Sequence, residues 1–181
     1  MFQINWKLKA LLYKVFETFK LNKTLYFVQR HITGRAKIQF TKLDPHWERH
    51  AKSIQEKNCN TILEVGAGKS LEQNIFFSYY FENSKFQKVI DINNMINFEL
   101  CNEASHRIAK LLNKDFKGQI KNNQDLINNY NINYEAPCKL EDIKEEKFDI
   151  CTSTASLEHF SREDLNLFLK QIKIVLKKNG F

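Results

Sequence analysis

Two glycines and one carboxylate in this chain have the spacing of a site for a nucleotide-type cofactor. An apolar run at residues 61–65 leads into Gly66 and Gly68, and a second short run at 88–90 ends in Asp91, 23 positions after Gly68. Glycine allows a turn to adopt positive φ and lets the backbone approach a ligand closely. A strand, a glycine turn, a helix and a second strand ending in an acid predict the first half of such a site.

The spacing within the turn separates three kinds of glycine-rich loop. A phosphate-binding P-loop would share the tail G-K-S at 68–70, but its first glycine would have to replace Leu63, inside the expected strand. A dinucleotide fingerprint would need its third glycine at Leu71. The pattern that remains is E-x-G-x-G, from Glu64 to Gly68. A purely structural turn or another nucleotide site is the alternative interpretation.

The rest of the chain alternates between strand and helix patterns. The expected strands are 61–65, 87–91, 131–135 and 147–153, and the expected helices are 70–82, 97–113, a short one within 113–131, and 162–177 capped by Ser161. This order predicts an α/β fold, a Rossmann-like parallel sheet flanked by helices. Ligands bind such sheets at the carboxyl ends of the strands. We therefore expect Gly66, Asp91 and the segment 153–159 to lie close together.

The excess positive charge lies in the first 37 residues. They hold eight of the 28 basic residues and one of the 21 acids, so the remainder is neutral. An amphipathic helix is indicated there by apolar residues at Ile4, Leu8, Leu11, Leu12, Val15 and Phe19. We divide the chain into a basic N-terminal helical extension, 1–58, and a cofactor domain, 59–181. The extension is predicted to cover the cleft as a lid or partner helix, or to contact an anionic membrane surface.

A helix within this extension is predicted to start at Asp44-Pro45, with the aspartate as N-cap and proline in the first turn. It would direct Trp47, His50 and Ile54 toward the core. His46 and His50 have the i, i+4 spacing of a metal pair, but we interpret them as surface histidines. The four cysteines form no C-x-x-C pair, and no signal peptide or 18-residue apolar run occurs. These features predict a cytoplasmic protein without a metal site.

Three local segments resemble the class I S-adenosylmethionine-dependent methyltransferases. They are L-E-V-G-A-G-K-S at 63–70, V-I-D-I-N at 89–93 and F-D-I-C-T-S-T-A-S-L-E-H-F at 148–160. The resemblance covers about residues 60–181 and implies a domain that binds S-adenosyl-L-methionine. The first two segments together are similar to methyltransferases associated with polysaccharide or sugar modification.

The resemblance implies how the cofactor is held. Gly66 and Gly68 would let the turn pack against the methionine portion, and Glu64 would orient the turn or, through a water, the amino group. Asp91 would accept hydrogen bonds from both ribose hydroxyls, since a carboxylate has several acceptor sites. Ile92 would pack on the adenine face. The implied cofactor-binding set is Glu64, Gly66, Ala67, Gly68, Asp91, Ile92 and Ser153.

The sulfonium methyl group would then face the segment from Ser153 to His159. His159 is the candidate catalytic residue, a general base for a hydroxyl, because imidazole exchanges protons near neutral pH. A packing or helix-capping role for this histidine is the alternative. Asp149 is expected to hold backbone beside the fourth strand.

The sequence departs from the family pattern at two places. Members often carry an acid for the adenine amino group after the third strand, whereas residues 136–142 have only the displaced Glu141 and Asp142. Their sheets usually have seven strands, and here Asn179-Gly180 would begin only the fifth. We therefore expect a fold that is incomplete after the fourth or fifth strand, as in a C-terminally truncated methyltransferase.

The resulting functional prediction is O-methyl transfer to a sugar or other small molecule, without a metal. The fourth strand ends in T-S-T at 152–154 and lacks the N/D-P-P-[YF] loop used on nucleic-acid bases, so no nucleic acid is expected as a partner. The alternative is a catalytically inactive remnant that acts only as a cofactor-binding or interaction module.

Overall fold

The computed structural model describes residues 37–81, 83–143, 147–154, 156–157 and 160–181. The predicted amphipathic helix between Ile4 and Phe19 lies outside these residues. In the part that is described, no helix combines the length and apolar character needed to cross a membrane.

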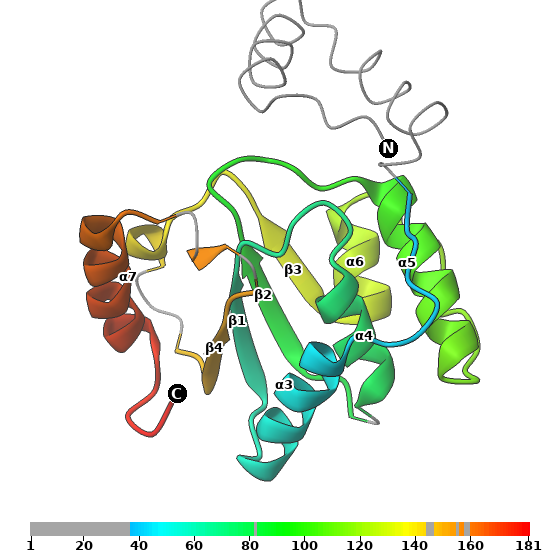
Figure 1. Ribbon diagram of the computed structural model, residues 1–181, viewed down its shortest axis with the longest axis horizontal. Coiled ribbons are helices and arrows are strands. Elements are labelled where there is room, and N and C mark those ends of the chain that lie inside the picture. The colour runs from blue at the N-terminus through cyan, green and yellow to red at the C-terminus, as the bar shows by residue number, and fades with distance from the viewer. Residues whose placement is uncertain (1–36, 82, 144–146, 155, 158–159) are drawn as a thin grey trace, which may run out of the picture. The chain divides into compact units, whose positions relative to one another are not determined.

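A four-stranded parallel sheet forms the centre of the described fold, in the order β3-β2-β1-β4 (Figure 1). Its strands are β1 (Thr61–Val65), β2 (Phe86–Ile90), β3 (Ile132–Glu135) and β4 (Ile150–Thr152). The strand order reverses at β1. The chain adds β2 and β3 on one side of β1 and then returns to place β4 on its other side. The predicted fold class, a Rossmann-like parallel sheet flanked by helices, is confirmed.

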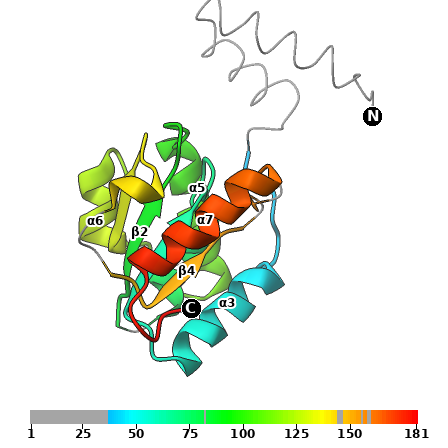
Figure 2. The ribbon, with the colours of Figure 1, turned by 90° about the vertical axis from the view of Figure 1, so that its left-hand side faces the viewer.

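Helices cover both faces of this sheet. The helices α4 (Glu72–Tyr80), α5 (Phe98–Leu111) and α6 (Asn123–Tyr130) connect β1 to β2 and β2 to β3. The helix α7 (Arg162–Val175) lies on the opposite side of the sheet from α5 and α6, and it is seen in front of the sheet in Figure 2. Among the described residues, each expected helix is present within a few residues of its predicted bounds, and Ser161 caps α7 by accepting from the Asp164 backbone N–H at 3.1 Å.

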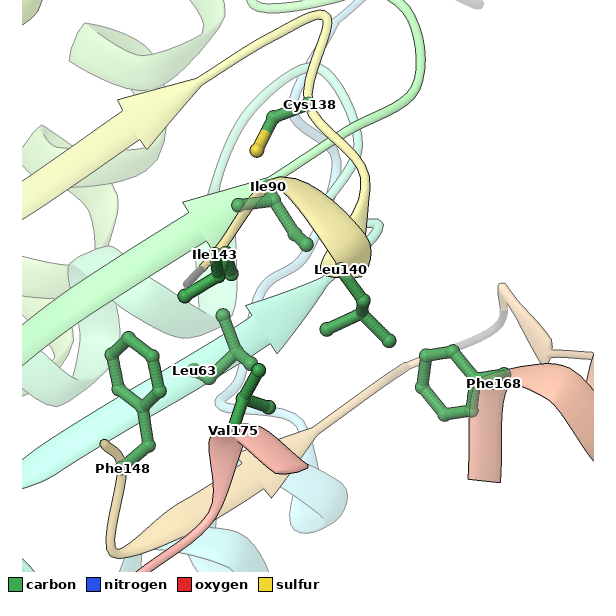
Figure 3. Close-up of a cluster of buried hydrophobic side chains, with 8 residues drawn as sticks. All are labelled: Leu63, Ile90, Cys138, Leu140, Ile143, Phe148, Phe168 and Val175. Atoms are coloured by element: carbon green, nitrogen blue, oxygen red, sulfur yellow. The ribbon is translucent and has the colours of Figure 1, made fainter. Parts of the chain in front are cut away.

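A buried apolar cluster joins α7 to the sheet. Its members come from β1, β2, the segment between β3 and β4 with the short helix η1 (Leu140–Asp142), and α7. Figure 3 shows these side chains: Leu63, Ile90, Cys138, Leu140, Ile143, Phe148, Phe168 and Val175. Because Leu63 and Ile90 belong to this cluster, the packing holds the two strands that lead into the glycine turn and Asp91.

The first described helix, α3 (Pro45–Glu56), packs against α4. Asp44 caps it by accepting from the His46 backbone N–H at 2.8 Å, as predicted. Trp47 is buried and its ring lies 5.9 Å from that of Phe76 in α4. The compact unit that contains the sheet therefore begins at Phe40, so α3 lies within it although the sequence analysis assigned this helix to the extension.

The fourth strand is shorter than predicted. β4 comprises only Ile150–Thr152, and Phe148 forms a separate bridge with Leu176 after α7. Beyond that bridge, Phe181 donates to the Asp149 carbonyl at 3.1 Å and accepts from the Cys151 N–H at 2.9 Å. The backbone at Phe181 thus pairs with β4 on the side away from β1.

Candidate functional site

The register of the sheet brings the glycine turn and Asp91 together. Val65 pairs with Ile90, and the Gly66 N–H donates to the Ile90 carbonyl at 2.9 Å. A Cβ atom placed on Gly66 would lie 3.9 Å from Asp91 Oδ1. The two residues that follow β1 and β2 therefore stand side by side at the carboxyl ends of the strands, where the sequence analysis expected them.

Both glycines of the turn have backbone conformations that favour glycine. Gly66 has φ of +78° and Gly68 has φ of +73°, in the left-handed region that other residues enter at a cost. Among the described residues, nothing lies within 4 Å of a Cβ atom placed on Gly68, so this part of the chain leaves the space beside it open. Ala67 lies between them and is half-buried. The Lys69 carbonyl accepts from the Asn97 N–H at 2.9 Å and holds the turn against the loop after β2.

Asp91 has an unsatisfied oxygen inside the site. The residue is only 4% exposed, and its Oδ2 atom is buried without a hydrogen-bond partner among the described residues. Burial raises the pKa of this carboxyl, while a hydrogen bond with Tyr134 opposes the rise. A buried acceptor without a donor is costly unless a ligand supplies one. This oxygen is therefore ready to accept from a hydroxyl group placed at the end of β2.

Apolar and amide side chains surround the region next to Asp91. Ile92 follows it directly and is 69% exposed, so its side chain is free to pack on a planar group. Tyr134, the partner of Asp91, also borders a cavity of about 360 Å³. The cavity is lined by Asn94, Ile96, Phe98, Asn122, Asn123, Tyr134 and Ala136. Sequence reasoning missed Tyr134, and no spacing signal marked it.

Glu64 is buried within β1 and faces α4 and β4. Its Oε2 atom accepts from Gln73 Nε2 at 2.8 Å, Asn74 Nδ2 at 3.1 Å and Thr152 Oγ1 at 3.3 Å. Burial raises the pKa of this carboxyl to about 7, although these three hydrogen bonds lower it. Glu64 thus ties the first residues of α4 to the end of β4, which fixes the elements on either side of the glycine turn.

The loop after β4 lies directly on the glycine turn. Ser153 Oγ donates to the Val65 carbonyl at 2.9 Å, and Ser156 Oγ donates to the carbonyls of Val65 and Gly66, each at 3.0 Å. A Cβ atom on Gly66 would come within 2.4 Å of Ser156 Oγ. The close approach that Gly66 permits is therefore made by Ser156 in this structure. Both serines lie in the segment 153–159 that was expected beside Gly66, although only Ser153 was named as a cofactor-binding residue.

Four other sequence predictions have different outcomes. His159 and its neighbour Glu158 lie outside the described residues, so the general-base prediction for His159 stays a prediction. Asp149 accepts from the Asn60 and Thr61 N–H groups at 2.8 and 2.9 Å, the structural role expected of it. Asp142 accepts from the Lys139 backbone N–H, and Glu141 accepts from the Lys139 ammonium group. Both acids therefore bond to a residue of the same short turn.

The two histidines of α3 have separate partners. His46 Nδ1 lies 2.9 Å from an Arg49 guanidinium nitrogen on the surface, as a surface histidine should. His50 Nδ1 instead lies 2.9 Å from Gln73 Oε1, and the ring is half-buried. The interpretation of His50 as a surface histidine was therefore wrong, whereas the prediction that this helix directs His50 toward the core fits its half-buried position, because α3 packs on α4.

The fold and this arrangement define a Rossmann-like domain with a cofactor-type site at the carboxyl ends of β1, β2 and β4. A family model described as methyltransferase domain matches residues 63–181, more than half of the chain. The chain belongs to this methyltransferase domain family.

Comparison with solved structures gives distant similarities. One is to "a putative O-methyltransferase from Klebsiella pneumoniae", with a TM-score of 0.47, 13% identity, and coverage of 84% of this chain and 66% of that one. Another is to an O-methyltransferase from Bacillus cereus in complex with SAH, with a TM-score of 0.45, 10% identity, and coverage of 85% and 62%. The chain thus spans less than two thirds of the length of either protein. A search of curated proteins gave no match.

Proposed function

We propose that this chain binds S-adenosylmethionine and transfers its methyl group to a hydroxyl of a small molecule or saccharide. Family membership supports methyl transfer as the reaction class. The observation that carries the cofactor assignment is the buried Asp91 Oδ2 without a partner, beside the glycine turn. A ribose has two adjacent hydroxyl groups that can donate hydrogen bonds, and a donor is what the Asp91 Oδ2 atom lacks among the described residues.

The residues around Asp91 fit the remaining parts of the cofactor. Ile92 offers an exposed apolar side chain for the adenine ring, and the open space at Gly68 allows the methionine portion to approach the backbone. Bound there, the cofactor would supply a methyl group on a positively charged sulfonium. The chain's own tasks would be to align an acceptor with that methyl group and to remove one proton.

An oxygen acceptor is favoured by the end of β4. The loop there carries the hydroxyls of Ser153, Thr154 and Ser156, of which Ser153 and Ser156 bond the glycine turn. It has no proline pair or amide side chain to recognise the amino group of a nucleic-acid base. The sugar assignment rests on the sequence resemblance alone.

The cofactor assignment is tested by isothermal titration calorimetry with S-adenosylmethionine. We expect wild-type protein to bind and Asp91→Asn to bind about 10- to 100-fold more weakly, since hydrogen bonds to a charged group contribute about 1.5–3 kcal/mol. Asp115→Asn, at an exposed acid remote from the turn in sequence, serves as the matched control and should bind like wild type. Absence of binding by the wild-type protein would refute the proposed function.

A further inference from the structure

Gln73 connects three elements at the carboxyl ends of β1 and β4. It is the second residue of α4, and its Nε2 atom donates to Glu64 Oε2 at 2.8 Å. Its Oε1 atom accepts from Thr154 Oγ1 at 3.2 Å and lies 2.9 Å from His50 Nδ1. The Gln73 side chain therefore holds an imidazole from α3 beside the loop that follows β4.

The chemistry of these contacts fixes which His50 nitrogen carries hydrogen. The Glu64 Oε2 atom receives three donors, so it is an acceptor whether the carboxyl is ionised or carries its proton on the other oxygen. The Gln73 atom facing it must then be the amide nitrogen, and the atom facing His50 must be the carbonyl oxygen. Because a carbonyl only accepts, His50 Nδ1 must be the donor. In the neutral ring, Nε2 is left with the lone pair.

The position of His50 suits contact with a substrate. Its ring is half-buried, so it is not sealed inside the core. Its partner Gln73 bonds both Glu64, near the end of β1, and Thr154, just after β4. The strand order of the sheet reverses between β1 and β4. Ligands of open parallel sheets bind at this reversal.

We propose that His50 is the proton acceptor for the methyl acceptor's hydroxyl, with Gln73 as a positioning residue that fixes its tautomer. This inference rests on the proposed function and adds a catalytic residue to it. His50 Nε2 would take the hydroxyl proton, so that an O–H bond breaks and an N–H bond forms. The acceptor oxygen then forms the new bond to the methyl carbon as the bond from carbon to sulfur breaks. The sulfonium charge ends on the imidazolium ring, and the sulfur leaves as a neutral thioether.

The tautomer is tested by nuclear magnetic resonance of the histidine ring nitrogens in the full chain at alkaline pH. We expect His50 to carry its hydrogen on Nδ1, with its signals assigned by their loss in His50→Asn. In Gln73→Leu, which removes the carbonyl, the signals should shift toward the Nε2–H form that free imidazole favours. His46→Asn is the matched control on the same helix and should leave the His50 signals unchanged. A wild-type His50 in the Nε2–H form would overturn the proposal, because no lone pair would remain to take a proton.

The catalytic role is tested with two probe acceptors, catechol and methyl α-D-glucoside, by following release of the demethylated cofactor. If either probe is turned over, His50→Asn should lower kcat by about 10²- to 10⁴-fold, as expected for loss of a general base. The asparagine amide can keep the hydrogen bond to Gln73, and His46→Asn should retain full activity. A wild-type rate in His50→Asn would refute the catalytic role. If neither probe reacts, the tautomer measurement decides.

Cofactor binding separates failure of this inference from failure of the proposed function. His50→Asn should bind S-adenosylmethionine within about twofold of the wild-type affinity, since a difference of that size is under 0.5 kcal/mol. No binding by wild-type protein would refute the proposed function and leave the tautomer result standing. Normal binding with the wrong tautomer would refute only the role of His50.

Discussion

The hydroxyl of Ser156 lies 3.0 Å from the carbonyl oxygen of Gly66, and a Cβ atom on Gly66 would come 2.6 Å from Ser156 Cβ. The loop after β4 and the glycine turn are therefore in direct contact. Gly68, two residues further on, has a similar φ, but no described residue comes within 4 Å of a Cβ atom placed on it. The two glycines of the turn are thus required for different physical reasons.

Alanine substitutions should separate these reasons. Gly68→Ala should lower the free energy of unfolding by about 1–2 kcal/mol, the cost of placing a residue other than glycine in the left-handed region. Gly66→Ala adds the same cost and the displacement of Ser156, so we expect it to lose about 1–3 kcal/mol more in the free energy of unfolding. Urea denaturation of the two variants measures the difference. The double variant Gly66→Ala/Ser156→Gly should recover part of it, and equal losses for both single variants would contradict this account.

Glu64 should make the stability of the fold depend on pH. Its pKa rises from 4.5 to about 7 on folding, so the folded state holds a proton that the unfolded state releases in this range. The stability that it contributes is fully present below pH 4.5 and is lost as pH rises through about 7.

The comparison variant for this prediction is Glu64→Gln, which keeps an acceptor but does not titrate. Between pH 4.5 and 7, wild-type protein should lose on the order of 3 kcal/mol of unfolding free energy relative to this variant. Urea denaturation across this pH range gives the difference. Parallel pH profiles for the two proteins would show that Glu64 does not titrate in that window.

Tyr134 should support cofactor binding through Asp91. Its hydroxyl accepts from the Met95 N–H at 3.2 Å and makes a hydrogen bond that lowers the pKa of the Asp91 carboxyl. In Tyr134→Phe, the pKa of Asp91 should therefore rise further, and affinity for S-adenosylmethionine should fall about three- to tenfold, because one net hydrogen bond is lost. Carbon nuclear magnetic resonance of the carboxyl and calorimetry measure the two effects. Tyr80→Phe, at a more exposed tyrosine, should change neither.

Asp149 should stabilise the fold at neutral pH and lose that effect in acid. Partial burial raises its pKa, but hydrogen bonds from Lys177, Asn60 and Thr61 outweigh burial and hold the pKa below the ordinary value of 3.8. Its contribution is therefore present above pH 3.8 and is lost as pH falls below that value.

The variant Asp149→Asn tests this sign. At neutral pH it should lose about 1–3 kcal/mol of unfolding free energy, because a charged acceptor of several hydrogen bonds is removed. The deficit should shrink when unfolding is measured at about pH 3, because the carboxyl of the unfolded wild-type chain is largely protonated there while the folded carboxyl stays ionised. A deficit that stays constant across this range would argue against an ionised Asp149 as the source of stability.

Local patterns in the sequence were sufficient for the order of the elements and for the first half of the site. Gly66, Gly68 and Asp91 follow strands whose apolar runs are visible, and parallel register then forces them together. The caps Asp44 and Ser161 were recognisable because an N-cap bond joins residues only two or three positions apart.

The contacts that the sequence did not reveal are those between distant residues. His50 meets Gln73 across 23 positions, Thr154 meets Gln73 across 81, and Glu64 meets Thr152 across 88. None of these pairs has a periodic signal, because their partners depend on how α3 packs on α4 and how β4 is placed beside β1. The helix pattern indicated that His50 faces the core, but its partner Gln73 could be identified only from the packing of α3 on α4.

The pairing of Val65 with Ile90 has a consequence for how this site tolerates change. Side chains of a strand alternate between its two faces, so a slip of one residue between β1 and β2 would carry Asp91 away from Gly66 and reverse its direction. Leu63 and Ile90 oppose such a slip from within the apolar cluster under α7. Core residues that do not contact a ligand therefore set the distance between Gly66 and Asp91, the two residues that would contact it.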